Sequence, residues 1–282
     1  MGKTLIFGTG STGRRIYEEI KNSTQIVGFL DNDSAKWGGE IDGVPVIGNG
    51  EAVAEIEYDE IVICSLPGMK AIQKQLLELG IPSNKINCEY ISTQVNARLN
   101  FLEDFSDLYA DLPETIAIAE GGVFQGDFAK EINRCFPNNK LFLFDTFEGF
   151  DERDTRKEHE KGFSIFEKSH LNITSAEAVL EKMPNSNMVE IRKGYFPETA
   201  EGLEQEKFFF VNLDFDLYNP TLDGLRFFYP RLDNRGIILI HDYYNPGYTG
   251  IKAAVDAYEK ELGIKLYRLP IGDHCSIAII KK

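Results

Sequence analysis

The feature that most limits how this chain can fold is an alternation of short apolar runs with amphipathic stretches, and this alternation starts twice. Short apolar runs bounded by turn residues are typical of buried parallel strands, and the stretches between them have helical spacing. A chain of 282 residues is long enough for two domains of ordinary size. The sequence therefore predicts an α/β protein with two Rossmann-like domains.

The expected first domain covers residues 1–93, a connecting helix lies within 94–114, and the second domain covers 115–282. The expected strands are 4–7, 25–30, 60–65, 85–90, 115–120, 141–145, 188–192, 208–213, 236–241, 265–269 and 276–280. The expected helices are 14–21, 69–79, 94–112, 127–135, 221–229 and 251–262, and residues 37–43 read as turns. A charged segment at 151–187 interrupts the second series. We expect it to cover the active site, with His159 and His170 as solvated surface residues.

Composition narrows the partners and the compartment. The formal net charge of −15 opposes binding to nucleic acid or to anionic lipid, both of which need a basic face. There is no signal-peptide pattern and no apolar stretch long enough to insert in a membrane. The cysteines, at positions 64, 88, 135 and 275, form no C-x-x-C pair, so reduced thiols in a cytoplasmic protein are expected. The sequence leaves a homo-oligomer open.

A glycine motif follows the first expected strand and opens a helix. Gly8, Gly10 and Gly13 have the spacing that lets a phosphate approach a helix N-terminus, and Asp31 ends the next strand, where ribose hydroxyls are commonly held. This pattern predicts a nucleotide site. The alternative is that the motif serves only as a scaffold and holds no dinucleotide.

A second glycine motif ends the first strand of the second series. Glu120 precedes Gly121, Gly122 and Val123, and Gly126 completes the turn. Glycine permits a close approach of backbone to ligand. The next strand ends in Asp145, at the sheet edge where ligands of open α/β folds bind. These positions suit a bound nucleoside, although an ordinary strand-to-helix turn and a capping aspartate explain them individually.

Three carboxylates and an imidazole follow the last two parallel strands. Asp214 and Asp216 come after one strand, and His241 and Asp242 end the next. Carboxylates that converge need a cation, a proton or a positive partner. Mg²⁺ would satisfy them and would make a substrate hydroxyl more acidic, so that a nearby aspartate could take the proton. A salt-bridged cluster without metal is the alternative.

Five motifs in order resemble the macrocin and mycinamicin sugar O-methyltransferase family across residues 115–258. They begin at Glu120, Asp145, Lys193, Leu213 and Gly236. The resemblance implies a class I fold that uses S-adenosylmethionine. It implies donor contacts at Glu120, Gly122, Gly126, Asp145, Thr146 and Phe147, and we expect Gly121 and Val123 of the same turn to contact the donor as well. By the same resemblance Asp214 is the general base, and Asp216, Asp242 and the residue before Asp242 hold Mg²⁺. We expect Asp214 to be a metal ligand as well.

One departure concerns the metal. His241 stands where the family usually has an aspartate. Because imidazole is a poor ligand for Mg²⁺ and suits Zn²⁺, Fe²⁺ or Mn²⁺ better, either another divalent cation binds or His241 serves as a base or a substrate contact.

The N-terminal segments 27–33, 36–38 and 41–48 resemble a Rossmann-like module of bacterial polysaccharide-biosynthesis proteins. That resemblance implies a sugar or sugar-nucleotide substrate. The expected function is therefore metal-assisted O-methylation of such a substrate. An NAD(P)-dependent sugar-nucleotide-modifying enzyme and a non-catalytic sugar-nucleotide-binding protein remain as alternatives.

Overall fold

The computed structural model describes residues 2–65 and 68–281, and the chain divides into two compact units, Met1–Asn96 and Ala97–Lys282. The boundary lies inside one helix, α3 (Glu89–Leu108), which begins and ends earlier than the expected connecting helix. The strand expected at 85–90 is reduced to β6 (Ile86–Asn87). The side chain of Asn87 accepts a hydrogen bond from the backbone N–H of Glu89 at 2.9 Å, which caps the helix start.

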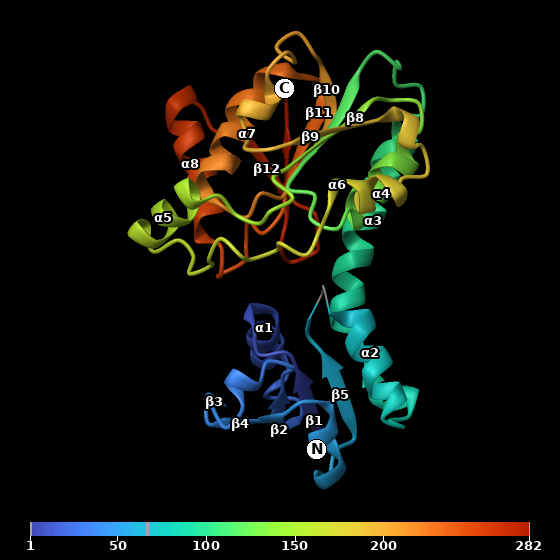
Figure 1. Ribbon diagram of the computed structural model, residues 1–282, viewed down its shortest axis with the longest axis vertical. Coiled ribbons are helices and arrows are strands. Elements are labelled where there is room, and N and C mark those ends of the chain that lie inside the picture. Colours follow the sequence, from blue (N-terminus) through green and yellow to red (C-terminus); the bar gives the residue numbers. More distant parts are fainter. Residues whose placement is uncertain (1, 66–67, 282) are drawn as a thin grey trace. The chain divides into compact units, whose positions relative to one another are not determined.

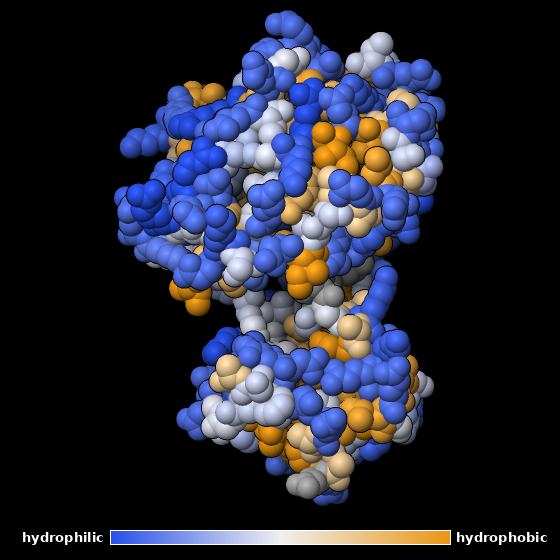
Figure 2. Space-filling model, in the orientation of Figure 1, coloured by the Kyte–Doolittle hydropathy of each residue, from blue (hydrophilic) through white to orange (hydrophobic). Residues whose placement is uncertain are grey.

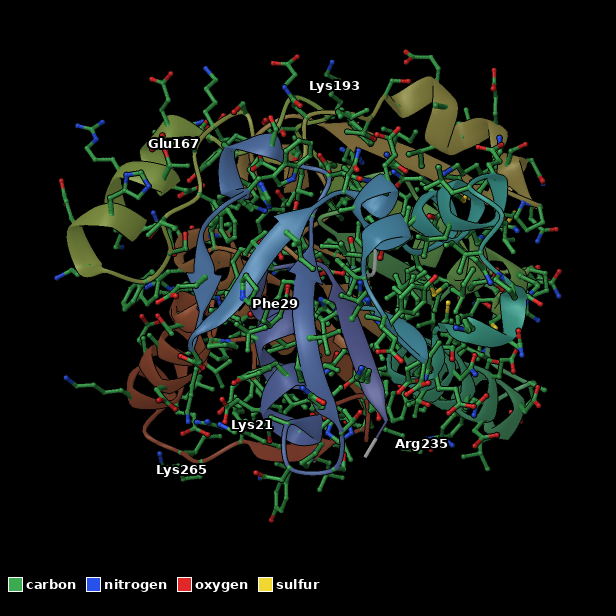
Figure 3. All side chains as sticks on the ribbon, turned by 90° about the horizontal axis from the view of Figure 1, so that it is seen from below. Lys21, Phe29, Glu167, Lys193, Arg235 and Lys265 are labelled. Atoms are coloured by element: carbon green, nitrogen blue, oxygen red, sulfur yellow. The ribbon has the colours of Figure 1, made fainter. Side chains whose placement is uncertain are left out.

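In the N-terminal unit, one mixed sheet has the order β3-β4-β2-β1-β5-β6. Its other strands are β1 (Lys3–Phe7), β2 (Gln25–Leu30), β3 (Glu40–Ile41), β4 (Val44–Gly48) and β5 (Glu60–Ile63), with helices α1 (Ser11–Ile20) and α2 (Met69–Glu78). Phe29 of β2 is fully buried, and Figure 3 shows it within the unit, whereas Glu167 and Lys193 of the other unit point outward. Strand β4 was not expected. It carries Pro45 and pairs in parallel with β2.

In the C-terminal unit, the described residues form a seven-stranded sheet of order β12-β13-β11-β10-β7-β8-β9. The strands are β7 (Ala117–Gly121), β8 (Leu141–Asp145), β9 (Val189–Lys193), β10 (Phe208–Leu213), β11 (Leu232–Ile240), β12 (Tyr267–Pro270) and β13 (Ile277–Ile280). Strands β7 to β11 pair in parallel, and β13 pairs antiparallel to both β11 and β12. The expected set of five parallel strands and a closing hairpin is confirmed.

Helices cover both faces of this sheet (Figure 1). Besides α3, the helices of this unit are α4 (Asp127–Cys135), α5 (Glu152–Lys161), α6 (Ala176–Glu181), α7 (Tyr218–Arg231) and α8 (Thr249–Leu262). One apolar cluster joins α7 and α8 to the sheet, and a second joins α3, α4 and α6 to the opposite face. Phe208, Phe209 and Phe210 are fully buried, as a central strand requires.

On the face drawn in Figure 2, hydrophilic residues predominate and apolar residues are scattered among them. All four cysteines lie in the described parts of the chain, and none of them forms a disulfide. None of the helices in residues 2–65 and 68–281 is long and apolar enough to cross a membrane.

Candidate active site

The strand register brings the predicted site residues to one edge of the C-terminal sheet. Strand β10 lies between β7 and β11, and Leu213 is in register with Gly121 on one side and Ile240 on the other. The next residues are therefore neighbours: Asp214 donates its backbone N–H to Gly121, and His241 donates its own to Leu213. The chain turns in opposite directions from β7 and β10, which is where ligands bind in open α/β sheets.

Asp214, Asp216 and Asp242 meet at this edge, and each offers an oxygen atom within 4.8 Å of the other two. Burial and the carboxylates of Asp242 and Asp214 raise the pKa of Asp216 well above its ordinary value. Both Asp216 (φ 64°) and Asp242 (φ 55°) adopt the left-handed backbone region, which is uncommon for residues with a side chain. The cluster thus brings three acidic side chains together on an uncommon backbone conformation, as functional sites often do.

His241 lies between two of these carboxylates. Its Nδ1 is 2.9 Å from Oδ1 of Asp214 and 3.3 Å from Oδ2 of Asp242. Burial alone would lower the pKa of His241, but the two carboxylates raise it well above its ordinary value. Oδ1 of Asp242 accepts hydrogen bonds from Asn245 at 2.9 Å and from the thiol of Cys275 at 3.0 Å. Sequence patterns did not identify Cys275 as part of this site.

Arg98 of α3 supplies a second cation to Asp214. Its Nη2 donates to Oδ2 of Asp214 and to Oδ1 of Asn212, both at 3.0 Å, and the guanidinium lies 3.8 Å above the ring of Phe128. Asn212 in turn donates to Oε1 of Glu120 at 2.8 Å. Arg98 was missed because it falls in the expected connecting helix, outside every motif. Only the fold brings it beside the strand ends.

Asp145 organises the two loops next to this cluster. Its Oδ2 accepts the backbone N–H groups of Val123 (2.7 Å) and Phe124 (2.9 Å), and its Oδ1 accepts that of Phe147 (2.7 Å). The hydroxyl of Thr146 donates to the carbonyl of Gly149 at 2.6 Å. The predicted donor-contact residues are therefore brought together, and the direct role of Asp145 in the structure is to fix the loop backbone.

The packing of the protein itself requires a glycine at position 122. A Cβ at this position would lie 2.0 Å from the carbonyl oxygen of Asp214, and its φ is +80°. A Cβ on Gly121 would meet the ring of Phe215 at 2.2 Å, and one on Gly126 would meet Val179 at 2.8 Å. These close approaches come from neighbouring segments, so the glycines need no ligand to explain them. Contact with a donor remains a prediction.

The charged insertion is tied to the same loops. Thr174 donates its hydroxyl to the carbonyl of Phe124, and Gln125 donates to the carbonyl of Ile173 at 3.1 Å. These bonds hold the segment that follows α5 against the turn after β7, as expected for an insertion at the site.

The expectation for His170 was wrong. This residue is half-buried, its ring stacks on Phe166 at 4.2 Å between centroids, and its Nε2 lies 3.2 Å from the hydroxyl of Tyr248. Phe166 of the insertion and Tyr248, just before α8, cover part of its ring, which the charged local sequence did not reveal.

The N-terminal motif folds as a strand-to-helix turn. A Cβ on Gly13 would lie 1.9 Å from the carbonyl of Gly8, whereas one on Gly10 would meet nothing within 4 Å. Asp31 accepts hydrogen bonds from the backbone of Thr9 and Asp33, and from Lys36. The carboxylate therefore holds its own loops, and a nucleotide at this turn stays a prediction.

The strand order of the C-terminal sheet, its closing antiparallel pair and the acidic strand ends at the reversal point define the class I S-adenosylmethionine-dependent methyltransferases. Residues 116–275 match the family model described as macrocin-O-methyltransferase (TylF), and the chain belongs to this family. Residues 1–87 match a second model, described as C2185-like, N-terminal.

Solved structures support the fold. The O-methyltransferase NovP is 21% identical, covers 66% of this chain and 80% of its own, and has a TM-score of 0.51. The calicheamicin methyltransferase CalS11 is 17% identical, covers 76% of this chain and 91% of its own, and has a TM-score of 0.55. No curated protein matches the chain.

Glu120 gives a testable pH dependence of stability. Burial raises the pKa of this carboxyl from 4.5 to about 8. An acid with a raised folded-state pKa contributes stability that is present below its unfolded pKa and is lost as the pH rises towards the folded value. Glu120→Gln is therefore expected to raise the melting temperature of the donor-free protein at about pH 9 more than at about pH 5. Equal effects at the two pH values would contradict this explanation.

Proposed function

We propose that this protein transfers a methyl group from S-adenosylmethionine to a hydroxyl of a sugar or sugar nucleotide, with help from a divalent cation. The observation that carries the proposal is the position of Asp214 and His241 beside Gly122, at the reversal point of a methyltransferase sheet. The names of the matched family and of NovP support oxygen as the acceptor atom, and the resemblance of the C-terminal motifs to sugar O-methyltransferases supports a sugar as the acceptor.

Asp214 is placed to receive the proton of the acceptor. Burial acts to raise its pKa, but His241 and Arg98 lower it, so the carboxylate stays ionised at neutral pH. In the transfer, the hydroxyl oxygen bonds to the methyl carbon while the carbon–sulfur bond breaks, and the electron pair remains on sulfur. The oxygen becomes strongly acidic as it gains the methyl group, so a weakly basic carboxylate can accept its proton. His241 holds this carboxylate in place.

The residues present fit a divalent cation. Asp214, Asp216 and Asp242 provide the oxygen ligands that Mg²⁺ prefers, and the crowding of these carboxylates raises the pKa of Asp216 in the absence of a cation. A bound cation would orient the acceptor hydroxyl and increase its acidity. His241, Asp242 and Cys275 form a second set with nitrogen, oxygen and sulfur donors. That set suits Zn²⁺ or Fe²⁺ better than Mg²⁺.

The test is methyl transfer from labelled S-adenosylmethionine to a panel of sugars and sugar nucleotides. We expect labelled product with at least one sugar hydroxyl, loss of labelling after treatment with a chelator, and recovery when Mg²⁺ or Mn²⁺ is added back. Labelling that survives complete chelation would refute the role of the cation. Donor binding without transfer to any sugar, but with transfer to another acceptor class, would refute the proposed substrate.

A further inference from the structure

Two buried polar atoms of opposite character lie in one network at the end of β7. Glu120 is 1% exposed, and its Oε2 has no hydrogen-bond partner among the described residues. Arg98 is also largely buried, and its Nε has no partner in the same part of the chain. Buried groups of this kind are costly and are usually satisfied by a ligand or by water. The carboxyl oxygen accepts hydrogen bonds when Glu120 is ionised, and the Nε–H group of Arg98 donates one.

These two atoms belong to side chains that are already held in place. Asn212 connects them, because it accepts from Nη2 of Arg98 and donates to Oε1 of Glu120. The guanidinium also stacks on the ring of Phe128. Since Phe128 lies in the first turn of α4, the positive end of that helix is close to the guanidinium. This is a fixed site with a carboxyl group and a guanidinium donor, and an ammonium group placed beside Glu120 would favour the ionised carboxylate.

We propose that Arg98 binds the carboxylate at the amino-acid end of S-adenosylmethionine, while Oε2 of Glu120 accepts from its ammonium group. This inference rests on the proposed function. The amino-acid end of the donor is a zwitterion, so it brings one charge of each sign to a network that holds one unsatisfied donor and one unsatisfied acceptor. A charge-assisted bond from guanidinium to carboxylate is among the stronger hydrogen bonds in proteins.

Arg98 lies in a segment that neither family model matches, since one model ends at residue 87 and the other begins at residue 116. The donor site is therefore completed by helix α3, which precedes the catalytic sheet in sequence. A catalytic domain that began at residue 115 would lack this residue.

The experiment compares two ligands that differ only in the carboxylate: S-adenosylmethionine and its decarboxylated form. Binding of each to the full chain is measured by calorimetry without an acceptor. We expect the wild-type protein to prefer the carboxylated ligand. Arg98→Gln should weaken its binding about 10- to 100-fold and leave binding of the decarboxylated ligand within about threefold. Arg134→Gln is the matched control, because Arg134 is half-exposed on α4 and pairs with Glu103 and Glu131.

The outcomes separate the two proposals. If the wild-type protein binds neither ligand, the proposed function fails and this inference fails with it. If the wild-type protein binds both ligands equally, or if Arg98→Gln weakens both by the same factor, donor use stands and the role of Arg98 is overturned. Should Arg98→Gln fail to fold, Arg98→Lys retains the charge, and it should preserve part of the preference for the carboxylated ligand.

Discussion

Asp214→Asn is expected to lower kcat for methyl transfer by about 10² to 10⁴, the range typical of removing a general base. The amide keeps the shape of the side chain, and its oxygen can still accept from Arg98, which lies 3.0 Å away. It cannot accept a proton at neutral pH, and it is a poorer ligand for a cation than the carboxylate. The measurement is kcat and KM with the best sugar acceptor, together with donor affinity.

Donor affinity should stay within about threefold of the wild-type value, because the proposed donor contacts are left in place. Asp223→Asn is a suitable control: Asp223 lies on α7 and pairs with Arg226, away from the strand ends. It should leave both kcat and KM unchanged. An Asp214→Asn enzyme that retained more than about a tenth of wild-type kcat would show that another group takes the proton, and His241 would then be the first to test.

The central strands could be predicted from the sequence because burial on both faces leaves a continuous apolar run. Leu141–Asp145 and Phe208–Leu213 have the bounds that were expected. Strand β4 could not be predicted in this way, since it lies near the sheet edge, is half-buried and contains Pro45. The start of α3 was also missed, because the signal is a single capping side chain, Asn87.

The site shows the same division between local and tertiary information. The meeting of Asp214, Asp216 and Asp242 followed from one rule, that the carboxyl ends of parallel strands share an edge. The site residues that come from other segments of the chain could not be recognised from the sequence around them. Arg98 reaches the site from α3, and Cys275 reaches it from the turn before β13. Motif spacing cannot identify such residues, because their positions depend on how distant elements pack.

The glycine motif illustrates a further limit. The pattern predicted a close approach of ligand to backbone, but at Gly122 the approaching atom is the carbonyl oxygen of Asp214. The requirement for glycine therefore couples the donor loop to the catalytic strand end. A change at Gly122 should disturb both, and this leads to the second large effect.

Gly122→Ala is expected to destabilise the C-terminal unit by about 3 kcal/mol or more, because the new Cβ has two separate costs. It adds a side chain at φ +80°, and it would lie 2.0 Å from the Asp214 carbonyl oxygen, so one of the two backbones must move. Gly202→Ala isolates the first cost, since Gly202 has φ +84° and open space around its Cβ position. That control should lose only about 1 to 2 kcal/mol.

Melting temperatures of both variants give the comparison. If the two variants lose equal stability, the contact with Asp214 is not a constraint. If Gly122→Ala loses more, and donor binding weakens with it, the turn after β7 and the catalytic aspartate form one rigid unit.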